Sequence, residues 1–189
     1  MATSPDASVT DSDAPDNQQA NPTFKELGVS AELVTALAES GIIEPFAIQA
    51  LTIEDALAGR DVLGKAKTGS GKTLAFGLPL LDRIEKADPR RPHGLVLVPT
   101  RELANQVKEV MAPLGKVVGR RVRAFYGGVG MDPQVEALRK GVDVVIGTPG
   151  RLIDLMERGE LSVAAVQVLV LDEADRMADM GFLPEVRRL

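Results

Sequence analysis

The chain has 189 residues, 44% of them hydrophobic, which is enough for one domain with a real apolar core. It has no cysteine, which excludes disulfides, thiolate metal sites and a cysteine nucleophile, and which fits a reducing cytoplasm. The net charge is −5, with four aspartates and no lysine or arginine in residues 1–22, so the remainder is nearly neutral and any nucleic-acid site must be local. No apolar run approaches the roughly 20 residues of a membrane span, and we expect neither a span nor a secretory signal.

Residues 1–22 are rich in serine, threonine, aspartate, proline and asparagine, with hardly an apolar side chain larger than valine. Such a segment cannot bury enough surface to offset the entropy lost on ordering, so we predict a disordered tail. A weak interaction tail is the functional alternative.

From Phe24 onward the sequence contains apolar residues at regular spacing, and two helices are expected before the first strand. Ser30 is placed as the N-cap of the first helix and Gly41 as its stop, and a second helix is expected over 45–58. One face of the first helix is apolar, with Leu33, Val34 and Leu37.

Short β-branched runs then alternate with helical patterns. Strands are expected at 61–64, 94–99, 122–126, 143–148 and 166–172. The helical pattern after the second of these has an apolar stripe of Leu103, Val107, Val110, Met111 and Leu114. Strands without polar alternation, separated by helices, predict an α/β fold: a mainly parallel sheet with helices on both faces. The last strand reads as fully buried.

Residues 66–73, "AKTGSGKT", follow the first expected strand and open a helix. They fit the phosphate-binding loop, with alanine in place of the first glycine of the strict pattern. Gly69 and Gly71 let successive backbone N–H groups curl toward phosphate oxygens at a helix N-terminus. Lys72 can reach the β- and γ-phosphates, and the Thr73 hydroxyl can ligate Mg²⁺. The alternative is an ordinary glycine-rich turn, which the order of strand, loop and helix disfavours.

Three carboxylates, Asp172, Glu173 and Asp175, follow the last expected strand. In open α/β sheets, ligands bind outside the carboxyl ends of the strands, where the phosphate-binding loop also belongs. One carboxylate can hold Mg²⁺, and the next can accept a proton from an attacking water. A polar helix start is the alternative, since acidic residues favour the first turn. Paired with the loop about a hundred residues upstream, the cluster favours hydrolysis of a nucleoside triphosphate.

Five motifs occur in one order, "AKTGSGKT", "PTRELA", "GG", "TPGR" and "DEAD". In this order they resemble the N-terminal half of a DEAD-box ATP-dependent RNA helicase, over about residues 24–189. The resemblance implies a RecA-like P-loop NTPase domain, incomplete at its C-terminus, that uses ATP and Mg²⁺. It divides the chain into the tail, an adenine-recognition segment at 23–50 and the first RecA-like domain at 51–189.

The resemblance also assigns roles around the nucleotide. Lys72 would bind the phosphates, Thr73 and Asp172 would support Mg²⁺, and Glu173 would orient the attacking water. Asp175 would relay the nucleotide state to neighbouring motifs. Nucleotide contacts are implied for Phe24, Gln49, Ala66, Lys67, Thr68, Gly69, Ser70, Gly71, Lys72 and Thr73.

The adenine-reading motif resembles "GIIEPFAIQ", residues 41–49. Gln49 would bond the adenine edge through its amide, and Phe24 would pack against the base. Ile42 and the pair Phe46 and Ala47 depart from the usual pattern. The alternative is a buried helical glutamine with two core phenylalanines.

The resemblance assigns RNA contacts to three further motifs: Pro99, Thr100 and Arg101; Gly127 and Gly128; Thr148, Pro149, Gly150 and Arg151. All three follow expected strand ends and should share one edge of the sheet. The plainer interpretation of Thr100 is an N-cap, and both roles are compatible. With five phenylalanines and one tyrosine, an aromatic platform for stacking bases is not expected. Backbone contacts predict RNA binding that is independent of base sequence.

The family's Ser-Ala-Thr motif and its second RecA-like domain, which supplies arginine fingers, do not occur in these 189 residues. We therefore expect this chain alone to bind ATP weakly, hydrolyse it very slowly and not unwind duplexes. Two alternatives stay open: a non-catalytic ATP- or RNA-binding module, which the intact Lys72, Asp172 and Glu173 disfavour, and a DNA-directed helicase, which the adenine motif and the "DEAD" spelling disfavour.

Overall fold

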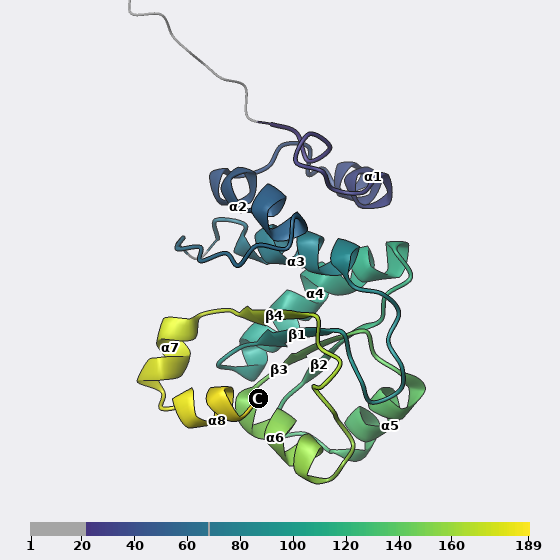
Figure 1. Ribbon diagram of the computed structural model, residues 1–189, viewed down its shortest axis with the longest axis vertical. Helices are drawn as coiled ribbons and strands as arrows, with labels where there is room; N and C mark the ends of the chain where they lie inside the picture. The colour runs from purple at the N-terminus through teal and green to yellow at the C-terminus, as the bar shows by residue number, and fades with distance from the viewer. Residues whose placement is uncertain (1–21, 68) are drawn as a thin grey trace, which may run out of the picture.

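The computed structural model describes residues 22–67 and 69–189. The predicted tail therefore lies outside the described residues except for Pro22. The described residues form a four-stranded, all-parallel sheet in the order β2-β3-β1-β4 (Figure 1). Its strands are β1 (Gly94–Leu97), β2 (Val122–Phe125), β3 (Val144–Gly147) and β4 (Val168–Leu171). The predicted α/β fold with a mainly parallel sheet is confirmed.

The strands are in register and end on one line. Leu97 of β1 pairs with Gly147 and with Leu171, and Gly147 pairs with Phe125. Hydrogen bonds from the backbone N–H groups of the residues after three of the strands extend the ladder by one position. Since parallel strands point the same way, every segment that follows a strand leaves the sheet at this edge.

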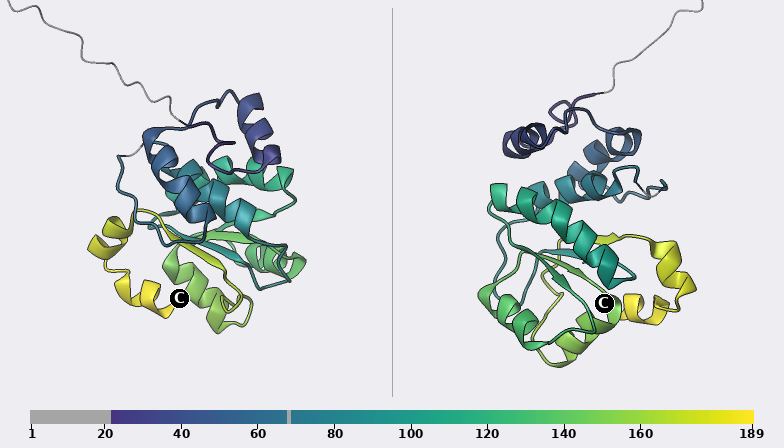
Figure 2. Two further views of the ribbon diagram at one scale, coloured as in Figure 1. Left: turned by 45° about the horizontal axis from the view of Figure 1, so that its top comes forward. Right: turned by 180° about the vertical axis from the view of Figure 1, so that it is seen from behind.

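Helices cover the sheet in two layers (Figure 2). One layer holds α3 (Lys72–Arg83) and α4 (Arg101–Val117), with α1 (Ala31–Glu39) and α2 (Ala47–Leu57) outside them. The other holds α5 (Asp132–Lys140) and α6 (Pro149–Glu157), followed by α7 (Ala174–Asp179) and α8 (Leu183–Arg188). α1 and α2 form within two residues of the bounds expected for the first two helices.

Alternation along the central strands builds a core on each face. Val96 of β1 points into the core under α3 and α4, whereas Leu95 and Leu97 point into the core under α5 and α6. This two-residue period is the pleat of a strand buried on both sides. No helix among the described residues has the length and apolarity to cross a membrane.

The strand expected at 61–64 does not form, and that prediction is wrong. Residues 60–67 run as irregular chain, and the side chain of Leu63 is fully exposed. A strand persists only when its backbone groups find a ladder partner. Within the described part of the chain, the edge strand β4 pairs with β1 alone. Strand propensity without a partner leaves residues 61–64 outside the sheet.

The prediction that β4 is fully buried is also wrong. Leu169 and Leu171 are 54% and 43% exposed, while Val168 and Val170 pack against the core under α3 and α4. β4 lies at the edge of the sheet, beyond the residues of α5 and α6 that cover β1 and β3. The apolar run indicates a strand correctly but not its position in the sheet.

Ser30 takes the N-cap position of α1 as expected, but its side chain does not cap the helix. Its Oγ donates to Asp82 Oδ1 at 2.5 Å, and its backbone N–H donates to Asp82 Oδ2 at 2.9 Å. Asp82 belongs to α3, the helix that begins at the phosphate-binding loop. The bond therefore ties the N-terminal segment to that helix.

Asp143 is the fully buried carboxylate that joins the amino end of the sheet. Its Oδ1 accepts from the Ala87 N–H at 2.6 Å and its Oδ2 from the Arg121 N–H at 2.5 Å, while its own carbonyl accepts from His93 and Gly94. Charge-assisted bonds to backbone N–H groups offset the cost of burying the carboxylate. One side chain thus fixes the loops that lead into β1, β2 and β3.

We expect Asp143→Ala to lower the free energy of unfolding by about 2–4 kcal/mol, because it leaves the buried N–H of Ala87 and the partly buried N–H of Arg121 without acceptors. Urea denaturation measures the loss. The exposed Asp179 at the end of α7 supplies the control, since Asp179→Ala should change the free energy by less than about 0.5 kcal/mol. Equal midpoints for the two variants would refute the role of Asp143.

Candidate functional site

The common edge of the four strands brings together residues that are far apart in sequence. Thr100 begins α4 after β1, Gly127 and Gly128 follow β2, Thr148 begins α6 after β3, and Asp172 follows β4. Their positions after strand ends predict this arrangement, and the in-line register produces it. The edge is therefore the candidate site.

The phosphate-binding loop reaches α3 without a strand before it. Gly71 is the N-cap of α3 with a φ of 83°, and Lys72 and Thr73 are the first residues of the helix. The Lys72 ammonium donates to the Ala66 carbonyl at 3.0 Å, across the loop. A Cβ on Gly71 would overlap the amide of Gln49, so both the left-handed backbone and the close approach require glycine. Thr68 lies outside the described residues.

Gln49 joins the start of α2 to this loop. Its Oε1 accepts from the Phe46 N–H and its Nε2 donates to the Gly71 carbonyl, each at 2.9 Å. Phe24 is buried in the core with Leu33 and other apolar residues. For Gln49 and Phe24 the geometry matches the alternative of a buried helical glutamine and a core phenylalanine. Their contact with adenine stays a prediction.

Phe46 is an aromatic residue beside this loop for which the sequence predicted no role. It is 58% exposed, and its ring lies against Gly71 of the phosphate-binding loop. An exposed aromatic ring beside a phosphate loop offers an apolar surface to a base. The signal in the sequence was its position three residues before Gln49.

Asp172 lies at the end of β4 and is 9% exposed. Its N–H donates to the Leu97 carbonyl at 3.0 Å, which continues the sheet ladder, and its Oδ1 accepts from the Glu173 N–H at 3.1 Å. Burial raises the pKa of Asp172 above its ordinary value, the positive charge of Lys72 opposes this, and the charge of Glu173 adds to it. Lys72 and Asp172, a hundred residues apart, therefore act on one another across the site.

Among the described residues, no group of three or more histidine, cysteine, aspartate or glutamate side chains could hold a metal ion. Mg²⁺ does not need such a cage, because it is commonly held by one or two carboxylates together with substrate phosphates and water. Asp172 and the Thr73 hydroxyl beside a phosphate-binding loop fit that type of site.

Glu173 has a left-handed backbone, with φ 53° and ψ 47°, at the N-cap of α7. This conformation costs a non-glycine residue about 1–2 kcal/mol and is concentrated at functional sites. Its carboxylate pairs with Arg176 at 3.0 Å. Asp175 is exposed in the first turn of α7. The backbone strain therefore lies at Glu173, the residue whose carboxylate is predicted to orient the attacking water.

The remaining motifs meet around the loop of residues 127–131. Thr100 caps α4, because its Oγ1 accepts from the Leu103 N–H at 3.2 Å. A guanidinium nitrogen of Arg101 lies 3.8 Å from the position of a Cβ on Gly128. Arg151 of α6 donates to the Val129 carbonyl at 3.2 Å. Arginines from two helices thus flank one glycine-rich loop.

The start of α6 differs from that of α4. Pro149 is the buried first residue of the helix, Gly150 is exposed with nothing within 4 Å of where its Cβ would be, and Thr148 makes no side-chain capping bond. The first N–H groups of a helix that no side chain caps are available to an anion.

Pro99 lies buried just after the end of β1, before Thr100.

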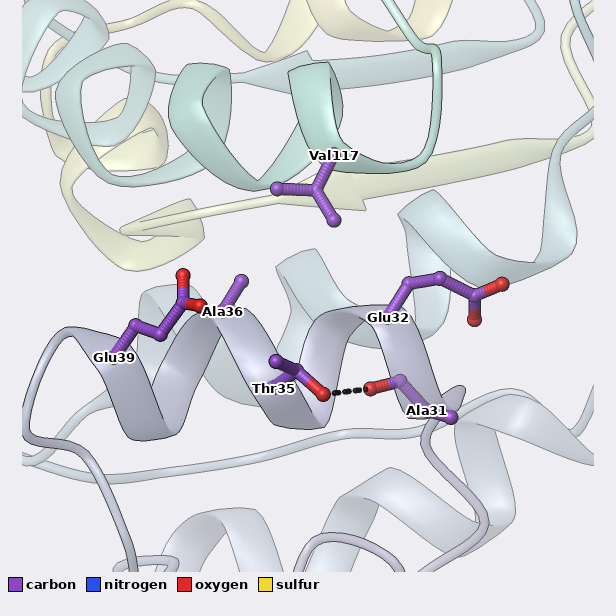
Figure 3. Close-up of a pocket in the computed structure, with 6 residues that line it drawn as sticks. All are labelled: Ala31, Glu32, Thr35, Ala36, Glu39 and Val117. Atoms are coloured by element: carbon purple, nitrogen blue, oxygen red, sulfur yellow. Dashed lines mark hydrogen bonds between the residues drawn. The ribbon is translucent and has the colours of Figure 1, made fainter.

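A separate hollow of about 500 Å³ lies between α1 and the end of α4 (Figure 3). Its charged groups are the carboxylates of Glu32 and Glu39, and the Thr35 hydroxyl already donates to the Ala31 carbonyl. A triphosphate needs cationic or N–H donors, which these side chains do not supply. The hollow is therefore not a second nucleotide site.

The raised pKa of Asp172 makes stability depend on pH. Between the ordinary aspartate value and the raised one, the folded state binds more protons than the unfolded state, so stability falls as pH rises through that window. We expect Asp172→Asn to raise the melting temperature of the metal-free protein at neutral pH, because it removes a charge that folding desolvates. Thermal melts in EDTA measure this, and a lower melting temperature for the variant would contradict it.

Comparison with known proteins agrees with this geometry. The family model for the DEAD/DEAH box helicase matches residues 46–189. The ATP-dependent RNA helicase DBP2 of Encephalitozoon cuniculi is 49% identical over 170 residues, which is 88% of this chain and 34% of that protein. The ATP-dependent RNA helicase DeaD of Escherichia coli is 49% identical over 168 residues, which is 88% of this chain and 27% of that protein.

Among solved structures, the RNA-helicase Prp28 from Chaetomium thermophilum bound to ADP superposes with a TM-score of 0.81 at 38% identity. The match covers 88% of this chain and 42% of that one. The chain spans between about a quarter and a third of the length of the curated relatives it matches. With the family model matched over most of its length, the chain belongs to the DEAD/DEAH box helicase family.

Proposed function

We propose that this chain is the ATP-binding part of an ATP-dependent RNA helicase. The observation that carries the proposal is that Lys72, at the start of α3, and Asp172, at the end of β4, lie close enough for the lysine charge to act against the rise that burial causes in the pKa of the carboxyl, next to Glu173 with its left-handed backbone. A domain that only bound nucleotide or RNA would have no need of a carboxylate placed beside the metal ligand to activate water.

In the proposed reaction the chain binds ATP, orients the attacking water and accepts a proton from it. Lys72 and the N–H groups at the start of α3 hold the triphosphate. To select adenine, Gln49 would have to exchange its bonds to Phe46 and Gly71 for bonds to the base, and Phe24 would have to leave the core to pack against it. Asp172 and Thr73 would hold Mg²⁺, which neutralises charge on the phosphates. The Glu173 carboxylate accepts a proton from the attacking water. Asp175, exposed on α7, couples the neighbouring motifs to whether ATP or its hydrolysis product is bound.

RNA is the proposed partner at the other end of the same edge. Thr100, Arg101, the pair Gly127 and Gly128, and the first turn of α6 present hydroxyl, guanidinium and N–H donors there. Such donors contact sugar and phosphate and do not distinguish bases, so binding is independent of sequence. Relatives carrying the name RNA helicase support RNA over DNA as the polymer.

Turnover by the 189-residue chain is proposed to be slow, since the resemblance places the arginine fingers in a second RecA-like domain. Arginine fingers of this kind raise the rate of related phosphoryl transfers about 10³–10⁵-fold. The open chain at 60–67, beside the phosphate-binding loop, agrees with weak ATP binding. A cytoplasmic location stays a prediction.

In the full-length protein, we expect Glu173→Gln to retain ATP affinity within about twofold and to lower the hydrolysis rate by about 10²–10⁴, because the amide cannot accept the proton of water. Single-turnover assays with labelled ATP, in the presence of RNA, measure the rate. Glu109→Gln on the exposed face of α4 is the matched control and should leave it unchanged. Undiminished hydrolysis by the Glu173 variant would exclude the role in orienting water.

We expect Arg151→Gln and Arg101→Gln each to weaken RNA binding and to reduce the slope of log K against log salt by about 0.7, the loss of one phosphate contact on a single strand. Fluorescence anisotropy with labelled oligouridylate measures both. Arg187→Gln, on the exposed face of α8, should change neither. Equal binding of oligothymidylate, with equal stimulation of hydrolysis, would favour the DNA-directed alternative.

A further inference from the structure

Gln134 is a buried polar residue to which no role has been given so far. It is the third residue of α5 and is 9% exposed, whereas Gly127 and Gly128 in the preceding loop are exposed. Its Nε2 donates to the Tyr126 carbonyl at 3.1 Å. Its Oε1 is buried with no hydrogen-bond partner among the described residues. An apolar side chain of similar size would spare the unpaired Oε1 but would leave the Tyr126 carbonyl without its donor, so the bond to that carbonyl is what the glutamine supplies.

The bond from Gln134 is one of several that fix Tyr126 and the loop of residues 127–131 that follows it. The Tyr126 hydroxyl pairs with the Asn105 amide of α4 at 3.1 Å. Arg151 of α6 holds the Val129 carbonyl at 3.2 Å. Three helices, two of which begin at predicted RNA-binding motifs, therefore converge on the loop. Gly128, between the two held carbonyls, has a φ of 81°.

Holding the Tyr126 carbonyl also sets the direction of the next N–H group. A trans peptide is planar, with its C=O and N–H pointing in opposite directions. The Tyr126 carbonyl points to the buried amide of Gln134, so the Gly127 N–H points away from it, out of the interior. An N–H turned to the surface beside Arg101 and Arg151 is placed to donate to a phosphate oxygen.

We propose that Gln134 is a positioning residue for RNA binding: by holding the Tyr126 carbonyl inward, it presents the Gly127 N–H to the RNA backbone. The inference rests on the proposed function, since it deepens the RNA-binding role of Gly127 and Gly128. Gln134 acts through the loop and does not touch RNA. Its effect on RNA affinity is therefore separable from its effect on ATP binding, whose residues lie around α2, α3 and the end of β4.

The test uses Gln134→Met, which keeps the size of the side chain and removes its donor. We expect the Kd for labelled oligouridylate to rise about tenfold, the effect of one lost hydrogen bond in a fixed geometry. The slope of log K against log salt should not change, because an N–H contact releases no counterion, in contrast to the arginine variants. The affinity for a fluorescent ATP analogue should stay within about twofold. Gln167→Met, at an exposed position outside the site, is the control.

Gln134→Leu is the second variant and keeps the test decisive if the methionine variant does not fold. Its apolar side chain has no donor for the Tyr126 carbonyl and buries no charge, so the same loss of RNA affinity is expected. RNA affinity equal to wild type in a folded variant overturns the inference. So does a parallel loss of RNA affinity, ATP affinity and melting temperature, which indicates a structural role only. If the wild-type chain itself binds no RNA, the proposed function fails first.

Discussion

The line on which the four parallel strands end is the constraint that the whole site depends on. Phe125, Gly147, Leu97 and Leu171 are neighbours across the sheet, so the segments that follow them start side by side. A slip of one residue in any strand would turn its apolar side chains to the opposite face and displace its loop. Burial of both faces of the central strands therefore also fixes the geometry of the chemistry.

At this edge, conformation is set mainly by side chains that bond to backbone. Gln49 and Lys72 hold carbonyls of the phosphate-binding loop, while Gln134 and Arg151 hold carbonyls of the loop after β2. Glu173, with its left-handed backbone, and the desolvated carboxylate of Asp172 work against folding. Such local costs are typical of sites whose geometry serves function.

The two ends of the site are braced to different degrees. Three helices hold the loop of the proposed RNA surface, whereas the phosphate-binding loop is reached through irregular chain and is supported by α2 and α3. Preorganisation lowers the cost of binding, and by this measure the loop after β2 is better preorganised than the phosphate-binding loop.

The sequence by itself determined the motifs, the helices and the parallel α/β class, because glycine spacing, capping residues and apolar periods are local signals. Thr100 capping α4 is one such case. Tertiary structure alone decided that residues 61–64 form no strand, that β4 is an exposed edge and that Gln49 and Gln134 hold loop carbonyls. Ladder partners, burial and buried hydrogen bonds depend on segments distant in the chain, and no local pattern encodes which of them will meet.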